Sequence, residues 1–124
     1  MTVFGFAEDD ASNPLVGLSL SDIENLPFGA AELDQQGAVL NYIDTEPGER
    51  AGAASKVGGN FFAAVAPWAG RSLIAEEFRK GVEIGTMNAV FDCAAARLPY
   101  KVRVHLKISP ILGTFWIFIK KLTR

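Results

Sequence analysis

The residues of this chain best suited to chemistry are a tyrosine and a glutamate four positions apart, Tyr42 and Glu46. They stand where a predicted strand ends and a turn begins, so both side chains can reach one apolar interior. A phenol and a carboxyl group can together bind a phenolate, a carboxylate or an amide. Burial favours the protonated carboxyl group, which then donates a hydrogen bond. The alternative is a core pair that only satisfies its own hydrogen bonds.

An apolar segment, residues 60–68, is predicted to form the wall of this pocket. It follows two glycines and runs into Pro67, which cannot continue the interior of a helix. We expect one short helical turn with a buried pair, Phe61 and Phe62, followed by a kink that turns Trp68 inward. Trp68 then either fills the interior, because large aromatic side chains exclude cavities, or forms a stacking wall for a planar ligand.

Three further side chains are candidates for the site or for a metal. Arg50 can pair with Glu46, clamp an anionic ligand in a bidentate manner, or lie on the surface. Cys93 is the single cysteine and lies on a later predicted strand, and we count it among the pocket residues. His105 has no second histidine or nearby cysteine, so no metal site is predicted. The chain shows no catalytic triad, no carboxylate pair with a base and no phosphate-binding glycine loop, so we assign no catalytic residue and no cofactor.

The composition is that of one globular domain. The chain has 124 residues, of which 49% are hydrophobic and 21% charged. No stretch approaches the ~18 apolar residues needed to span a bilayer, and the first residues lack the basic region of a secretory signal. A single cysteine suits a reducing compartment, so we expect a cytoplasmic protein that does not bind membranes.

Charge is unevenly distributed along the chain. Residues 1–49 carry ten acids and no Lys or Arg, whereas residues 50–124 carry twelve bases and four acids, which gives −10 and +8. This pattern is compatible with a basic patch for an anionic partner. We favour two halves that pack on each other, because the total charge is −2 and no nucleic-acid-binding motif is present. No nucleic-acid partner is expected.

Local patterns predict the order of the secondary structure elements. Residues 28–33 and 38–42 form a hairpin around a turn at Asp34 to Gly37. A helix over residues 71–85 places Ile74, Phe78 and Val82 on one face, with Ser72 as its N-cap and Gly85 as its stop. Three strands complete the chain. They cover residues 87–96, 100–108 and 114–122, the second with strict alternation and the third apolar on both faces.

These elements predict an α+β protein of the PAS type. We expect a five-stranded antiparallel sheet with the connecting helices on one face. Residues 1–26 are predicted to be an N-terminal cap on the other face, over Lys101, Arg103, His105 and Lys107, and residues 27–124 the PAS core domain.

The chain resembles the photoactive yellow protein family, bacterial blue-light sensors with the PAS fold. The similar stretches cover nearly all of residues 26–122. They include Leu26-Pro27-Phe28-Gly29-Ala30, Gly59-Asn60-Phe61-Phe62 with Val65-Ala66-Pro67, Phe78-Arg79-Lys80-Gly81-Val82, Lys101-Val102-Arg103-Val104-His105 and Trp116-Ile117-Phe118-Ile119-Lys120-Lys121. The resemblance implies a sensory module with an internal ligand pocket.

The resemblance also implies a change at the chromophore site. In the family, a cysteine directly after the Val-Ala-Pro segment carries p-coumaric acid as a thioester, and here Trp68 stands in that place. An indole cannot replace a thiolate nucleophile. Tyr42 and Glu46 match the residues that hydrogen-bond the chromophore, whereas Arg50 and Gly52 replace the family's threonine and arginine. Cys93 occupies a place that the family fills with an aromatic residue. We therefore expect a protein without the covalent chromophore.

Three functional hypotheses follow. The first is a chromophore-free PAS module that binds a small aromatic or acyl molecule non-covalently or regulates a partner. The second is a structural or protein-interaction module with a pocket filled by Trp68, its partner being another protein or a second copy. The third is an accessory enzyme in which Glu46 acts as acid or base on a small aromatic or acyl substrate.

Overall fold

A computed structural model gives the architecture of the chain. It describes residues 2–6, 10, 13–15, 18–19, 21, 26, 28–44, 57–94, 100–109 and 111–123. Two predicted site residues, Glu46 and Arg50, lie outside these residues, as does Gly52. None of the described helices is long and apolar enough to cross a lipid bilayer.

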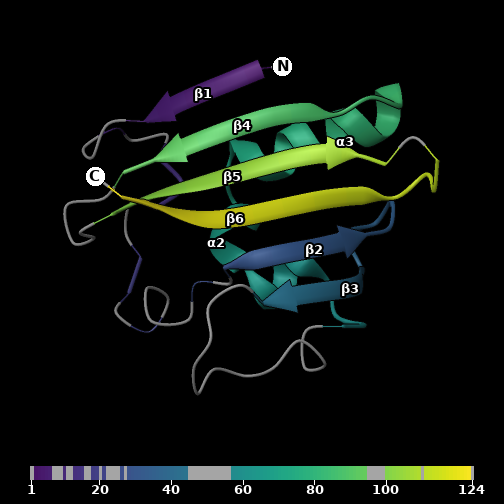
Figure 1. Ribbon diagram of the computed structural model, residues 1–124, viewed down its shortest axis with the longest axis horizontal. Helices are drawn as coiled ribbons and strands as arrows, with labels where there is room; N and C mark the ends of the chain where they lie inside the picture. The colour runs from purple at the N-terminus through teal and green to yellow at the C-terminus, as the bar shows by residue number, and fades with distance from the viewer. Residues whose placement is uncertain are drawn as a thin grey trace.

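The fold is a single mixed sheet with helices on one face, which confirms the predicted α+β PAS class (Figure 1). The sheet has six strands in the order β1-β4-β5-β6-β2-β3. The strands are β1 (Thr2–Phe6), β2 (Gly29–Leu33), β3 (Val39–Asp44), β4 (Asn88–Cys93), β5 (Tyr100–Ile108) and β6 (Phe115–Thr123). All neighbouring strands are antiparallel except β1 and β4, which are parallel.

Alternation along β5 separates the two faces of the sheet. Val102, Val104 and Leu106 are fully buried against the helices, while Lys101 and Lys107 on the other face are exposed. This is the strict period of two that the sequence predicted for residues 100–108. The inner strand β6 differs from expectation, because Phe118 on its second face is 36% exposed. The described elements therefore cover β6 fully on one side only.

The helical elements lie between β3 and β4 in sequence and behind the sheet in Figure 1. They are η2 (Phe61–Val65), a turn of π-helix, then α2 (Pro67–Gly70) and α3 (Leu73–Ile84). The helix is shorter than the predicted range 71–85, but its predicted N-cap and its predicted stop are confirmed. The Ser72 hydroxyl accepts a hydrogen bond from the Ile74 amide, and Gly85 ends the helix in the left-handed conformation. Ile74 and Phe78 are buried on the face that meets the sheet.

The N-terminal segment differs from the predicted cap and five-stranded sheet. Its first described residues form β1, a sixth strand that pairs in parallel with β4 at the edge of the sheet. The rings of Phe4 and Phe6 stack on Phe91, with centroids 4.8 and 6.4 Å away, which explains why this short segment joins the sheet.

The described cap residues also lie elsewhere than predicted. Leu15, Leu18 and Leu26 belong to the core cluster between the sheet and the helices. The Asn13 side-chain amide donates a hydrogen bond to the Ala94 carbonyl, just beyond the end of β4. These three leucines therefore lie in the helix-side core, and the prediction that the segment covers the opposite face is wrong for them.

Candidate functional site

Asn60 positions the aromatic segment of the predicted pocket. Its Oδ1 accepts hydrogen bonds from the amides of Phe62 and Ala63, at 3.0 and 3.2 Å, and so caps η2. Its Nδ2 donates to the Gln36 carbonyl in the β2–β3 turn, at 2.7 Å. One side chain thus begins the helical turn and joins it to the hairpin.

The two phenylalanines that follow enter a chain of aromatic contacts. Phe61 is 1% exposed, and its ring meets that of Phe62 edge to face, with centroids 5.3 Å apart. Phe62 contacts Phe78 of α3 at 5.0 Å, and Phe78 contacts Phe115 of β6 at 5.5 Å. The predicted aromatic pair therefore connects η2 to both the long helix and the sheet, although Phe62 is only partly buried.

Pro67 and Gly70 define the short helix that carries Trp68. Pro67 is the first residue of α2, where its missing amide hydrogen costs nothing, so the predicted kink is the junction between two helical turns. At the other end, a Cβ built on Gly70 would lie 2.2 Å from the Phe62 carbonyl oxygen. Only glycine allows α2 to approach η2 this closely. Trp68 lies between these residues and is 6% exposed.

Tyr42 approaches the same interior from the sheet. It lies on β3 opposite Ala31 of β2 and is 7% exposed. Tyr42, Phe61, Trp68 and Cys93 all belong to one cluster of buried side chains. The structure thus brings four of the seven predicted site residues into one core, with Phe62 packed against it.

Cys93 has the properties of a structural cysteine. It is fully buried on β4, opposite Val102 of β5. Burial raises the pKa of its thiol to about 12, and the neighbouring Asp92 carboxylate adds to the shift. Since the thiolate is the nucleophilic form, this side chain is unreactive in the folded protein at neutral pH.

The outward face of the sheet holds two polar clusters that the sequence patterns did not predict. Glu32 is 7% exposed and accepts hydrogen bonds from Thr114 Oγ1 at 2.6 Å and Asn41 Nδ2 at 2.7 Å. These bonds, the one from Thr114 first, hold the pKa of its carboxyl group below the ordinary value. Arg103 donates two hydrogen bonds to Asp92, at 2.7 and 3.0 Å. In both clusters the partner residues come from distant parts of the sequence, which a linear pattern does not reveal.

His105 lies on the same face. Its Nε2 is 2.8 Å from Asn88 Oδ1, and its ring contacts that of Phe118. Desolvation, followed by the positive charges of Lys107 and Arg103, lowers the pKa of His105 below its ordinary value. Within the described part of the chain, no three His, Cys, Asp or Glu residues are grouped as metal ligands would be.

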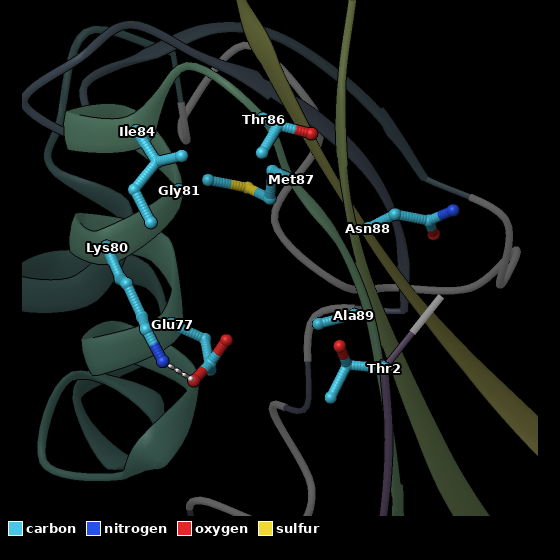
Figure 2. A pocket seen from close by; sticks show the side chains of 9 residues that line it. All are labelled: Thr2, Glu77, Lys80, Gly81, Ile84, Thr86, Met87, Asn88 and Ala89. Carbon is cyan, nitrogen blue, oxygen red and sulfur yellow. Dashed lines mark ion pairs between the residues drawn. The ribbon is translucent and has the colours of Figure 1, made fainter.

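A cavity of about 340 Å³ lies away from the predicted pocket, between the end of α3 and the first residues of β1 and β4. Figure 2 shows Glu77, Lys80 and Ile84 on the helix side, facing Thr2 and Ala89 on the strands. Glu77 and Lys80 form an ion pair of 3.6 Å at its rim. Neither residue lies on the apolar face predicted for this helix, and nothing in the sequence places Thr2 opposite them. No predicted site residue lines this cavity.

Comparison with known proteins gives full-length relatives, although no protein-family model matches. The chain is 34% identical over 125 residues to a photoactive yellow protein of Rhodothalassium salexigens, covering 98% of this chain and 99% of the relative. It is 35% identical over 125 residues to that of Halochromatium salexigens, covering 98% and 100%. Among solved structures, it resembles the photoactive yellow protein domain of the sensor histidine kinase Ppr from Rhodospirillum centenum. That match has 30% identity and a TM-score of 0.63, and it covers 85% of this chain and 94% of the domain.

Proposed function

Because the chain belongs to the photoactive yellow protein family, a family of sensory and signalling PAS modules, we propose that it is a regulatory module that works without a covalently attached p-coumaric acid. In this proposal the side chain of Trp68 occupies the space that the chromophore fills in the family. The module then acts through a protein partner. The related domain of Rhodospirillum centenum belongs to a sensor histidine kinase, which is consistent with such a role.

The observation that carries the proposal is the burial of Trp68. It directly follows Val65-Ala66-Pro67, is 6% exposed and belongs to the same core cluster as Tyr42 and Phe61. A buried tryptophan side chain removes ~150–250 Å² of surface from solvent and leaves little room for a second aromatic ring. A planar ligand that entered this place would have to displace the indole.

The chemistry of Cys93 supports the same conclusion. Attachment as a thioester requires a thiolate attacking an activated acyl group. The only sulfhydryl group of the chain is fully buried, and its pKa is raised to about 12. Neither Trp68 nor Cys93 fits the prosthetic group of the family, so we assign no step to it.

The proposal is tested by exposing the native protein to p-coumaric anhydride and measuring its intact mass and visible absorbance. We expect no coumaroyl thioester and no visible absorbance band; any amide formed on exposed lysine amines is told apart by its resistance to hydroxylamine. The same reagent on protein unfolded in guanidinium should acylate Cys93, which shows that the reagent is competent. A stoichiometric adduct on the native protein, with a new visible band, would overturn the proposal.

A further inference from the structure

The cavity between α3, β1 and β4 is a pocket separate from the interior around Trp68. Its volume of about 340 Å³ lies at the lower end of the ~300–1,000 Å³ range of ligand pockets. At ~30 Å³ for each water-sized group, it has room for roughly eleven non-hydrogen atoms. Tyr42, Phe61 and Trp68 do not line it. The cavity therefore has the size of a second site, for a small molecule.

The inner wall of the cavity is apolar. Met87 and Ala89, at the start of β4, are buried. A Cβ built on Gly81 would lie 2.6 Å from the Met87 methyl group, so a glycine at this point of α3 lets the methionine side chain lie against the helix. Ile84, which also lines the cavity, is exposed and marks its solvent side. A ligand would find a buried apolar surface on one side and an opening on the other.

Opposite charges stand side by side at the rim of the cavity. The Lys80 Nζ is 3.6 Å from the Glu77 Oε1, which is longer than the ~2.7–3.2 Å of an N–H···O hydrogen bond. An ion pair of this kind on a helix surface contributes little to stability. Neither side chain forms an ion pair with any other described residue. Both charged groups therefore keep hydrogen-bonding capacity for a ligand.

The strand side of the cavity adds a second acceptor. Figure 2 shows the Thr2 hydroxyl on β1 and the Glu77 carboxylate on α3 on opposite walls, both turned toward the space between them. A hydroxyl oxygen and a carboxylate can both accept hydrogen bonds from one ammonium group. Lys80, next to the carboxylate, supplies donors for an anionic group.

These groups select the charge type of the ligand. A simple anion attracted to Lys80 would also meet the Glu77 carboxylate, and a simple cation attracted to Glu77 would meet Lys80. A zwitterion gives each charge a partner of opposite sign. We propose that this cavity binds a free aliphatic α-amino acid. Its ammonium group donates hydrogen bonds to Glu77 and Thr2, and its carboxylate accepts from Lys80. Its side chain packs on Met87 and Ala89, where burial of apolar surface favours binding.

This site is independent of the proposed role of Trp68. The amino acid can fail to bind while the native protein still resists p-coumaric anhydride, and the reverse outcome is equally distinct. Because the ligand contacts both α3 and β1, it should hold the edge strand in place. Slower amide hydrogen exchange in β1 is therefore an expected result of binding.

Binding is measured by isothermal titration calorimetry with the full chain and L-leucine, which has about nine non-hydrogen atoms and fits the volume of the cavity. N-acetyl-leucine removes the ammonium charge, leucinamide removes the carboxylate, and glycine removes the apolar side chain. We expect saturable binding of leucine at one site. Each of the other three compounds should bind about tenfold more weakly or worse, because each leaves one part of the cavity without its partner.

Variants of the charged pair test the assignment of the two contacts. Glu77→Gln and Lys80→Gln should each weaken leucine binding by about tenfold or more, since each removes a charge-assisted hydrogen bond. Glu76→Gln and Arg79→Gln make the same charge changes at exposed positions of α3 that do not line the cavity. These two controls should leave the affinity unchanged, and circular dichroism checks that every variant is folded.

Nuclear magnetic resonance locates the ligand. Leucine should shift the backbone amide signals of Thr2, Thr86 and Ala89, which line the cavity. Shifts centred on Tyr42 and Phe61 instead would place the ligand in the core and would overturn the proposal. So would the absence of saturable leucine binding, equal affinity for N-acetyl-leucine, or unchanged affinity in both Glu77→Gln and Lys80→Gln.

Discussion

At the scale of a single residue, the first prediction concerns the buried side chain of Trp68. Its side chain is 6% exposed and lies in the cluster that includes Tyr42, Phe61 and Cys93. Trp68→Ala should open a cavity and lower the free energy of unfolding by about 3–5 kcal/mol, because the surrounding core relaxes only partly. Chemical denaturation of wild type and variant measures this difference.

Trp116 provides the matched control for this experiment. It is only partly buried on the outward face of β6, so Trp116→Phe should cost much less. In the Trp116→Phe background the remaining tryptophan fluorescence comes from Trp68, and acrylamide should quench it poorly. Ready quenching together with a small loss of stability in Trp68→Ala would contradict a buried indole.

The second prediction concerns Glu32 and the pH dependence of the free energy of unfolding. Hydrogen bonds from Thr114 and Asn41 hold its pKa in the folded protein below the ordinary value of 4.5. A depressed pKa means that the unfolded chain binds more protons, so this stabilisation is present above pH 4.5 and is lost as the pH falls through the folded pKa. Thr114→Val removes the larger contribution and should cost about 1.5–3 kcal/mol at pH 7.

Urea denaturation of Thr114→Val and wild type across the acid range checks this expectation. The difference between the two should shrink as the pH falls from 4.5 through the lower folded pKa of Glu32, because its carboxylate then becomes protonated in both proteins. Thr86→Val is a suitable control, since Thr86 is exposed and no hydrogen bond from its hydroxyl to another described residue is present. A difference that is constant with pH would show that the loss comes from packing.

At the scale of elements, the contact between η2 and α2 depends on a glycine. A Cβ on Gly70 would lie 2.2 Å from the Phe62 carbonyl oxygen, and the backbone there cannot move without shifting η2. Gly70→Ala should lower the free energy of unfolding by about 1–3 kcal/mol, the usual cost of overpacking. It should also change the near-ultraviolet circular dichroism of Trp68. Gly5→Ala, where a Cβ meets nothing within 4 Å, is the control and should be nearly neutral.

The elements that the sequence predicted well are those set by local signals. Ser72, Gly85 and the spacing of Ile74 and Phe78 specify α3 without reference to the rest of the chain. The alternation of β5 and the turn of the β2–β3 hairpin are local in the same sense. From them the PAS class follows, together with the buried places of Tyr42 and Trp68.

Features set by distant pairing were not predicted. β1 is a strand because Phe4 and Phe6 stack on Phe91, which is distant in the sequence, and nothing within residues 2–6 shows this. The hydrogen bonds that hold Glu32 come from Asn41 and Thr114 and require the sheet register. Glu46 and Arg50 lie outside the described residues, so their predicted roles stay predictions.

At the scale of the whole molecule, the sheet joins the acidic and basic parts of the chain. β2 comes from the acidic residues 1–49, and it pairs with β6 from the basic residues 50–124. Both ion pairs between described residues, however, lie within residues 50–124. Among the described residues, the two parts are joined by the β2–β6 ladder and by the apolar core.

The last prediction concerns the parallel edge strand β1 and whether the sheet unfolds as one unit. β1 joins only β4, and the stacking of Phe4 and Phe6 on Phe91 holds it there. A terminal strand with one neighbour is expected to open locally, below the free energy of global unfolding. Phe4→Ala should therefore speed amide hydrogen exchange in β1 and β4. The opening free energy derived from exchange in β5, and the free energy of global unfolding, should each change by about 1 kcal/mol or less. Val3→Ala, on the same strand with a side chain 57% exposed, should leave exchange near the wild-type rates. If Phe4→Ala instead accelerates β5 and β6 as much as β1, the edge strand unfolds with the whole sheet and the idea of a separate opening step is wrong.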